Sequence, residues 1–315
     1  MAKIVVLNGQ KVNYDGCIDY SVLGEDVTVY PDSAPEEILP RLEGAEVVVT
    51  KELVLTPEQV QGMPDSLRLI CEAGTGYNNI PLEAARQKGI AVCNIPAYST
   101  QRVAHTAVLL LLSLASNMQR QIRMLERGDH SNFTRALGVE HTEVNGKTLG
   151  VLGEGAIGRK VIQLARALDM EVLVYTRTPR PDSEGVRHCT LEELLRRSDY
   201  LSLHCPLTPE TRHIIDREAL EKMKLTACII NTSRGALIDE PALIEALQAG
   251  KIAGAGLDVQ ETEPPAVDNP LYTMENVILT PHMGWKGLET RQRLVAMLAD
   301  NIRAFLSGSP INRVC

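Results

Sequence analysis

The sequence predicts an α/β fold of two parallel-sheet domains, and three observations support that prediction. Short apolar runs alternate with segments of helical periodicity along most of the chain, which is the pattern of parallel strands joined by crossover helices. At 315 residues the chain is long enough for two separate hydrophobic cores. The alternation changes over near residues 99 and 284, so we expect one domain over 99–284 and a discontinuous domain over 1–98 and 285–315.

The first block alternates from the start of the chain. Thr56 is expected to cap a helix whose first residue is Pro57, and Gly89 is expected to end a helix over 82–88. The other expected elements are a strand over 4–8, a helix after it, a strand over 27–30, a short helix over 35–42, and strands over 45–50, 67–73 and 90–94.

A long helical pattern then runs from Ser99 to about Arg127. It is apolar on most faces between Val103 and Leu114, so we expect it to be buried at a domain junction or in a subunit interface. Residues 128–145 lack periodicity and indicate an arm or loop. The second block is expected to contain strands over 148–152, 171–175, 200–205, 227–231, 252–259 and 277–280, helices over 191–197, 216–222 and 240–248, a loop over 260–272, and a final helix over 288–306 that returns to the first domain.

A glycine-rich turn stands between the apolar runs 148–152 and 171–175. Gly153 permits a tight turn, Gly155 lets backbone approach a pyrophosphate, and Gly158 lets the following helix pack closely on the strand. That helix directs unpaired N–H groups and its positive dipole end at the anion. A lone GxGxxG is a weak signal, but this one lies between two strand patterns with a helix inside, and it therefore predicts a Rossmann-like dinucleotide site.

The composition argues against several other classes of protein. The net charge of -8 speaks against a nucleic-acid surface and gives no support for attraction to a membrane surface. We expect neither a signal segment nor a membrane span, because the longest apolar stretch, 106–115, is about half the length of a span. The seven cysteines are scattered without CxxC pairs or zinc-like clusters, so we expect no metal site, reduced thiols and a cytoplasmic protein.

Three residues that could carry chemistry follow strand ends of the second block. Arg234, Glu263 and His282 come after the strands over 227–231, 252–259 and 277–280, at the edge where doubly wound sheets bind ligands. A guanidinium suits a carboxylate and its neighbouring carbonyl, a histidine can pass a proton at neutral pH, and a carboxylate fixes the histidine tautomer. Each residue alone would more simply be a surface or turn residue. Together they predict reversible hydride transfer between a nicotinamide cofactor and a small 2-keto acid.

The segments around these residues also resemble the D-isomer-specific 2-hydroxyacid dehydrogenases over essentially the whole chain. The resemblance implies that Arg234 binds substrate, that Glu263 supports His282, that His282 is the acid/base, and that the active site lies in the cleft between the two domains. Besides the glycine turn, it rests on NTSRGALID at 231–239, GLDV at 256–259, EPP at 263–265, TPH at 280–282, LHCPLT at 203–208 and GTGYNNI at 74–80.

The resemblance further implies a set of ligand contacts. The backbone of Gly74, Thr75 and Gly76 would hold the substrate carboxylate. The expected cofactor contacts are Gly153, Gly155, Ala156, Ile157 and Gly158 at the pyrophosphate, Cys205, Pro206 and Thr211 along the adenosine side, Thr232 and Asp258 near the nicotinamide amide, and Ser233 and Thr100.

Thr176 stands where NAD-dependent members usually carry an aspartate for the ribose hydroxyls. Arg177 and Arg180 follow, and their guanidiniums could bind a 2′-phosphate; the simpler alternative is that both only decorate an exposed turn. We therefore expect NADP to be preferred over NAD. Glu154 is an acid in the phosphate turn where the family commonly has a small or apolar residue, and we expect its side chain to point to solvent. Met283 departs from the usual aliphatic residue after the histidine and could line the pocket or pack.

Within the family, GYNN at 76–79, YST at 98–100 and LETRQRL at 288–294 look most like glycerate dehydrogenases, that is, hydroxypyruvate reductases. That similarity favours reduction of hydroxypyruvate or glyoxylate to D-glycerate or glycolate. A broader D-2-keto-acid reductase of the D-lactate type and a non-enzymatic dinucleotide sensor of the corepressor type stay open as alternatives. Family habit and the apolar helix at 103–114 indicate a homodimer joined through the cofactor domains. The residues that border the pocket, none of which the sequence can rank, are Lys51, Tyr77, Arg102, Met283 and Trp285.

Overall fold

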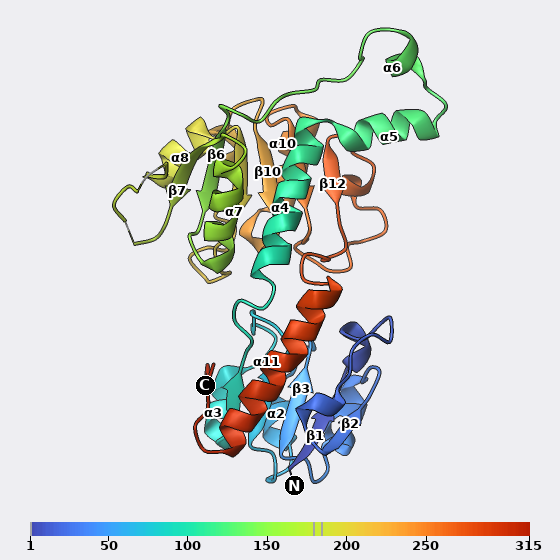
Figure 1. Cartoon of the computed structure of the whole chain (residues 1–315), viewed down its shortest axis with the longest axis vertical. Helices are drawn as coiled ribbons and strands as arrows, with labels where there is room; N and C mark the ends of the chain where they lie inside the picture. The colour runs from blue at the N-terminus through green and yellow to red at the C-terminus, as the bar shows by residue number, and fades with distance from the viewer. Residues whose placement is uncertain (1, 179, 184) are drawn as a thin grey trace. The chain divides into compact units, whose positions relative to one another are not determined.

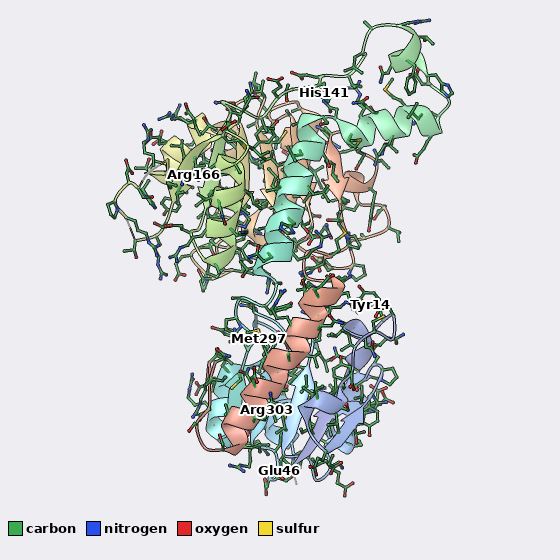
Figure 2. The ribbon with its side chains drawn as sticks, in the orientation of Figure 1. Tyr14, Glu46, His141, Arg166, Met297 and Arg303 are labelled. Atoms are coloured by element: carbon green, nitrogen blue, oxygen red, sulfur yellow. The ribbon has the colours of Figure 1, made fainter. Side chains whose placement is uncertain are left out.

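A computed structural model of the chain describes residues 2–178, 180–183 and 185–315. The chain divides into two compact units, one formed by Met1–Ser99 with Trp285–Cys315 and the other by Thr100–Gly284. Each unit is a parallel sheet with helices on both faces, and side chains fill the space between helices and sheet (Figures 1 and 2). The predicted fold class is confirmed.

In the first unit the strands pair in parallel in the order β2-β1-β3-β4-β5. Because successive strand residues point to opposite faces, Ile4 and Leu69 pack in one core with α11, while Val5 and Ile70 pack in the other with the remaining helices. The elements are β1 (Lys3–Val6), β2 (Asp26–Val29), β3 (Val47–Thr50), β4 (Leu69–Glu72), β5 (Ala91–Cys93), α1 (Ile38–Arg41), α2 (Pro57–Gly62), α3 (Leu82–Lys88) and α11 (Leu288–Leu306).

The helix signals of this unit are confirmed. Thr56 caps α2: its hydroxyl accepts a hydrogen bond from the Gln59 backbone N–H at 3.1 Å, and the Gln59 side chain accepts one from the Thr56 N–H at 2.9 Å. Pro57 is the first helical residue. Gly89 ends α3 in the left-handed region, with φ of 76°, where a glycine carries no steric penalty.

The helix expected between β1 and β2 is wrong. The described residues there form only 3-10 turns over Gly9–Lys11 and Ser21–Leu23. The side chains of Asn13, Asp15 and Asp19 accept hydrogen bonds from backbone N–H groups two to five residues further along the chain. These local bonds compete with helical ones, so the segment folds as a series of turns.

In the second unit the strands pair in parallel in the order β12-β11-β10-β9-β6-β7-β8. From β6 the chain adds β7 and β8 on one side, and then returns to add β9 and the later strands on the other side of β6, so the strand order reverses at β6. That point is where ligands of such sheets bind. Helices α4 and α7 cover one face, and α8, α9 and α10 the other. The strands are β6 (Thr148–Leu152), β7 (Glu171–Tyr175), β8 (Arg187–His188), β9 (Tyr200–Leu203), β10 (Cys228–Asn231), β11 (Gly254–Leu257) and β12 (Val277–Leu279), and these helices are α4 (Thr100–Ala115), α7 (Ala156–Arg166), α8 (Leu191–Arg197), α9 (Arg217–Glu221) and α10 (Glu240–Gln248).

The single long helix expected up to Arg127 is also wrong, because it breaks into α4 and α5 (Met118–Glu126). The break is at Asn117, whose φ of 46° lies in the left-handed region that asparagine tolerates. Its side-chain amide donates to the Glu140 carbonyl at 2.6 Å, which fastens the break to the returning chain. Beyond it, α5 and the short α6 (Ser131–Thr134) project from the sheet as an arm (Figure 1).

Candidate active site

The glycine turn joins β6 to α7, and its geometry fits a dinucleotide. Gly153 has φ of +101°, and a Cβ there would lie 2.7 Å from the backbone nitrogen of Cys205. A Cβ on Gly158 would lie 2.1 Å from the Gly153 carbonyl oxygen. A Cβ on Gly155 would instead meet nothing within 4 Å, so open space is left in front of the N-terminus of α7, which begins at Ala156 and Ile157. An anion placed there would receive the unpaired N–H groups of the first helical turn.

The loop after β9 lies against this turn, because β9 is the neighbour of β6 and Cys205 contacts Gly153. Its shape is fixed by Thr211, whose hydroxyl donates to the Pro206 carbonyl and accepts from the Thr208 N–H, both at 2.7 Å. The three residues predicted for the adenosine side of the cofactor are therefore gathered beside the glycine turn.

The loop after β10 holds a buried hydroxyl that fits a ligand. Within the described part of the chain, the Thr232 Oγ1 has no hydrogen-bond partner, although it is buried. Buried polar atoms in folded proteins are normally paired, so a partner supplied by a bound molecule would satisfy it. The neighbouring Ser233 hydroxyl donates to the Leu203 carbonyl at 2.8 Å, and Thr100, also predicted to contact the cofactor, is the first residue of α4.

Beyond β7 the structure corrects one expectation. Thr176 donates its hydroxyl to the Thr178 carbonyl at 2.7 Å, and Arg177 is exposed. Glu154, however, does not point to solvent: its side chain is 17% exposed and lies 3.0 Å from the Arg180 guanidinium. The carboxylate lies instead among Arg159, Arg180 and His188 at the edge of the sheet. The sequence alone could not show these partners.

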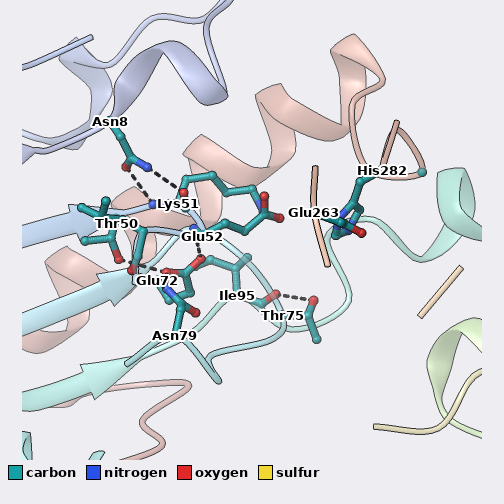
Figure 3. Close-up of polar contacts among 12 residues, drawn as sticks. Asn8, Thr50, Lys51, Glu52, Glu72, Thr75, Asn79, Ile95, Glu263 and His282 are labelled. Atoms are coloured by element: carbon teal, nitrogen blue, oxygen red, sulfur yellow. Dashed lines mark hydrogen bonds and ion pairs between the residues drawn. The ribbon is translucent and has the colours of Figure 1, made fainter. Parts of the chain in front are cut away.

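The predicted acid/base pair is formed directly. His282 Nδ1 lies 2.8 Å from Glu263 Oε2 (Figure 3). Since an ionised carboxylate can only accept, Nδ1 carries the proton of this bond and Nε2 is the ring nitrogen that remains for a substrate. The other carboxylate oxygen of Glu263 accepts from the Gln260 N–H at 3.0 Å, so the carboxylate is held from both sides.

Asp258 fixes the turn that carries His282. Its carboxylate is buried and accepts from the Thr280 hydroxyl at 2.6 Å and from the N–H groups of Met283 and Gly284, both at 2.8 Å. These bonds clamp the chain on either side of His282, which has φ of 47°. The sequence did not predict these hydrogen bonds from Asp258 to the turn. The expected contact of Asp258 with the nicotinamide amide stays a prediction.

Arg234 lies on the loop next to this pair, with its guanidinium folded back onto the Ser233 carbonyl at 2.7 Å. The loop packs tightly on the segment that carries Glu263, because a Cβ on Gly235 would lie 1.9 Å from the Gln260 carbonyl. The structure therefore joins Arg234, Glu263 and His282 through contacting loops after β10, β11 and β12. It shows direct side-chain contact only for the histidine and the glutamate.

In the first unit, hydrogen bonds to two backbone carbonyls fix the orientation of the Gly74–Gly76 loop after β4. The Gly74 oxygen accepts from the Ile95 N–H at 2.8 Å, and the Thr75 oxygen accepts from the Asn94 amide at 2.7 Å. Across a trans peptide the N–H points opposite to the C=O. The N–H groups of Thr75 and Gly76 are thus both directed away from these partners, as a pair of donors suited to a carboxylate.

Lys51 is a buried cation of the same unit. Its ammonium lies 2.6 Å from Glu52 Oε1 and 4.0 Å from the centre of the Trp285 ring, and a Cβ on Gly74 would lie 3.3 Å from it. Burial opposes the charge, but Tyr98, Glu52 and Glu72 outweigh it and raise the pKa of Lys51 above 10.5. Of the five pocket candidates, Lys51 is therefore placed against the Gly74 loop (Figure 3), and the Trp285 ring packs on the Lys51 ammonium.

A cavity of about 550 Å³ opens beside the His282–Glu263 pair within the second unit. Thr280 and Pro281 line it, and so do Gln119 and Arg123 of α5. Among the described residues no group of three histidine, cysteine or acidic side chains could hold a metal ion, and no helix is long and apolar enough to cross a membrane.

Comparison with known proteins gives the family. A model of the "D-isomer specific 2-hydroxyacid dehydrogenase, NAD binding domain" matches residues 108–284. A hydroxypyruvate reductase of Blautia hydrogenotrophica is 38% identical, and the match covers 99% of each chain.

Two solved structures extend the comparison. An acyclic imino acid reductase in complex with NADPH and D-Arg superposes with a TM-score of 0.86 at 29% identity, over 99% of this chain and 100% of that one. A D-lactate dehydrogenase of Aquifex aeolicus, complexed with NAD and lactic acid, superposes with a TM-score of 0.82 at 30% identity, over 98% of this chain and 96% of that one.

These similarities agree with the site. The family model covers the glycine turn and the loops that carry Arg234, Glu263 and His282. The chain therefore belongs to the D-isomer specific 2-hydroxyacid dehydrogenases, and it is an oxidoreductase that uses a nicotinamide cofactor and acts on small 2-hydroxy or 2-keto acids.

Proposed function

We propose that the enzyme reduces hydroxypyruvate or glyoxylate to D-glycerate or glycolate with His282 as the acid/base. The observation that carries the proposal is the 2.8 Å contact between His282 and Glu263 at the ligand-binding edge of the sheet, beside the loop of Arg234. The likeness over the full length to a named hydroxypyruvate reductase supports the substrate class. A broader D-2-keto-acid reductase is the alternative, and the named D-lactate dehydrogenase supports that one.

Each residue of the trio has a distinct task in this reaction. The bound nicotinamide supplies the hydride. Nε2 of His282 donates a proton to the substrate oxygen during reduction and takes one during oxidation, while Glu263 keeps the proton of Nδ1 in place and compensates the charge of the imidazolium. Arg234 releases the Ser233 carbonyl and binds the substrate carboxylate and keto oxygen with its planar donors. The N–H groups of Thr75 and Gly76 supply further donors to that carboxylate.

The proposed cofactor is NADP rather than NAD. Thr176 offers no carboxylate to the ribose hydroxyls, and Arg177 and Arg180 follow it at the end of β7. The proposed assembly is a homodimer joined through the cofactor unit. Apolar side chains exposed on α4, α5 and α6, among them Ile122 and Phe133, support it.

A panel of 2-keto acids assayed with both reduced cofactors tests the proposal. We expect kcat/KM to be highest for hydroxypyruvate or glyoxylate and to be higher with NADPH than with NADH. A maximum for pyruvate or a branched keto acid would favour the broader reductase. A ratio well in favour of NADH would end the NADP assignment, and no turnover of any 2-keto acid with either cofactor would contradict the proposed reaction.

A further inference from the structure

Glu154 is the centre of a charge cluster that the proposed reaction does not use. Its carboxylate lies 3.0 Å from Arg180 Nη1, 3.2 Å from His188 Nε2 and 3.7 Å from Arg159 Nε. The three partners come from different parts of the unit: Arg159 from α7, His188 from the edge strand β8, and Arg180 from the segment that joins β7 to β8. The His188 side chain is only 10% exposed, so the cluster is packed into the edge of the sheet and is not an arrangement of freely solvated side chains.

The cluster lies near the strand end at which dinucleotide-binding sheets bind the adenosine ribose. The Gly153 N–H donates to the Tyr175 carbonyl at 2.9 Å, which ties the glycine turn to the last residue of β7. Glu154 therefore follows directly after the point where turn and strand end meet. In dinucleotide-binding sheets, a carboxylate at this strand end takes the ribose hydroxyls, or an arginine nearby takes the 2′-phosphate. Here Thr176 supplies no carboxylate, and the one that is present comes from the glycine turn instead.

We propose that Glu154 sets the cofactor preference as an internal competitor: its carboxylate occupies the cations that would bind the 2′-phosphate and thereby weakens the binding of NADPH. The inference deepens the proposed function, on which it rests for the identity of the ligand that Arg180 would take.

The competition follows from charge and geometry. A phosphate monoester carries between one and two negative charges at neutral pH and is bound best by planar guanidinium donors. Arg180 directs one such donor at Glu154. A phosphate that approaches Arg180 must either displace the carboxylate or lie beside a like charge, and both lower its affinity. A ribose with a free 2′-hydroxyl meets neither obstacle, so the penalty falls on NADPH alone.

The test measures binding rather than turnover. Dissociation constants of NADPH, NADH and adenosine 2′,5′-bisphosphate are determined by calorimetry for the wild type and for Glu154→Gln. We expect the variant to bind NADPH and the bisphosphate roughly two- to fivefold more tightly, which is the scale of a partly exposed charge interaction, and to bind NADH with an unchanged dissociation constant. Glu171→Gln, at the opposite end of β7, removes the same charge from an exposed position and should leave all three constants unchanged.

A double-mutant cycle identifies the cation through which Glu154 acts. In an Arg180→Met background the gain from Glu154→Gln should largely disappear, because no guanidinium is left to be released. Unchanged or weaker NADPH binding by Glu154→Gln overturns the inference. So does weaker NADH binding, since Glu154 would then be holding the ribose hydroxyls. A wild type that prefers NADH ends the proposed NADP assignment but leaves the expected gain of Glu154→Gln intact, so the two failures can be told apart.

Discussion

His282 is the residue on which the proposed chemistry depends, and its neighbours set its geometry. The backbone is in the left-handed region, Asp258 clamps the chain on both sides, and Glu263 orients the ring. The sequence could predict His282 and Glu263 because each follows a strand end, where parallel sheets collect ligand-binding side chains. It could not predict the role of Asp258, because the bonds to residues 280–284 depend on distances across the sheet.

Substitution at His282 should separate chemistry from folding. Asparagine tolerates the left-handed backbone but cannot act as an acid or base, so we expect His282→Asn to lower kcat by about 10²- to 10⁴-fold while cofactor affinity is kept. Glu263→Gln should cause a smaller loss of kcat, because the ring loses its charged partner. Steady-state kinetics and cofactor titration measure both effects.

His213 provides a matched control for this prediction. It also has a positive φ, 52°, and its Nε2 lies 2.9 Å from Glu261 Oε1. His213→Asn therefore removes a second histidine–glutamate pair, whose glutamate lies on the same loop as Glu263 but which has no part in the proposed reaction, and it should leave kcat near the wild-type value. If the two asparagine variants lost activity equally, His282 would not be the acid/base.

At the scale of elements, helix boundaries with a strong local signal could be predicted from the sequence. The range of α11 and the cap of α2 are examples, because apolar periodicity and a capping box are properties of neighbouring residues. The break at Asn117 and the two-residue strand β8 could not be predicted. The first depends on a contact with Glu140 and the second on pairing with β7, and both partners are distant in sequence.

The start of α11 is fastened by a buried arginine that confers a pH dependence on the first unit. Arg291 is 2% exposed and donates to both carboxylate oxygens of Asp15, at 2.9 and 2.6 Å, and to the Val12 carbonyl at 2.9 Å. The hydrogen bond from Arg291 is the main cause that lowers the pKa of Asp15 from 3.8 to about 2. A depressed carboxyl pKa stabilises the fold above the unfolded value, and this stabilisation is lost as pH falls from about 4 to 2.

Asp15→Asn should therefore lower the melting temperature by a few degrees at pH 7 and flatten its decline between pH 4 and 2. Thermal unfolding followed by circular dichroism over that pH range measures both effects. Asp300→Asn, which breaks an exposed ion pair with Arg303 on the same helix, should change the melting temperature little. An acid dependence of Asp15→Asn equal to that of the wild type would show that this ion pair does not contribute.

At the scale of the whole molecule, the family and the reaction class could be predicted because their motifs are local in sequence. The charge cluster around Glu154 could not, because it is assembled from α7, β8 and the segment between β7 and β8. The acid itself was visible in the glycine turn, but its partners become its neighbours only after the sheet forms. Sites whose residues come from several distant segments therefore cannot be predicted from the sequence motifs alone.

Large apolar side chains are exposed on the arm of the second unit, which α5 and α6 form. Ile122 is 47% exposed on α5 and Phe133 is 78% exposed on α6, although apolar groups of this size normally seek burial. If the enzyme is a homodimer joined through this unit, these side chains should be buried by the second copy. Charges placed on them would then be forced into an apolar contact, at a cost sufficient to separate the copies.

We expect sedimentation velocity to give twice the chain mass for the wild type and a single chain mass for the double variant Ile122→Glu, Phe133→Glu. Leu225→Glu is the control, since Leu225 is an apolar residue outside the arm whose 68% exposure lies between those of Ile122 and Phe133. It should remain dimeric. A double variant that stays dimeric would exclude the arm from the interface, and a wild type of single chain mass would contradict the proposed homodimer.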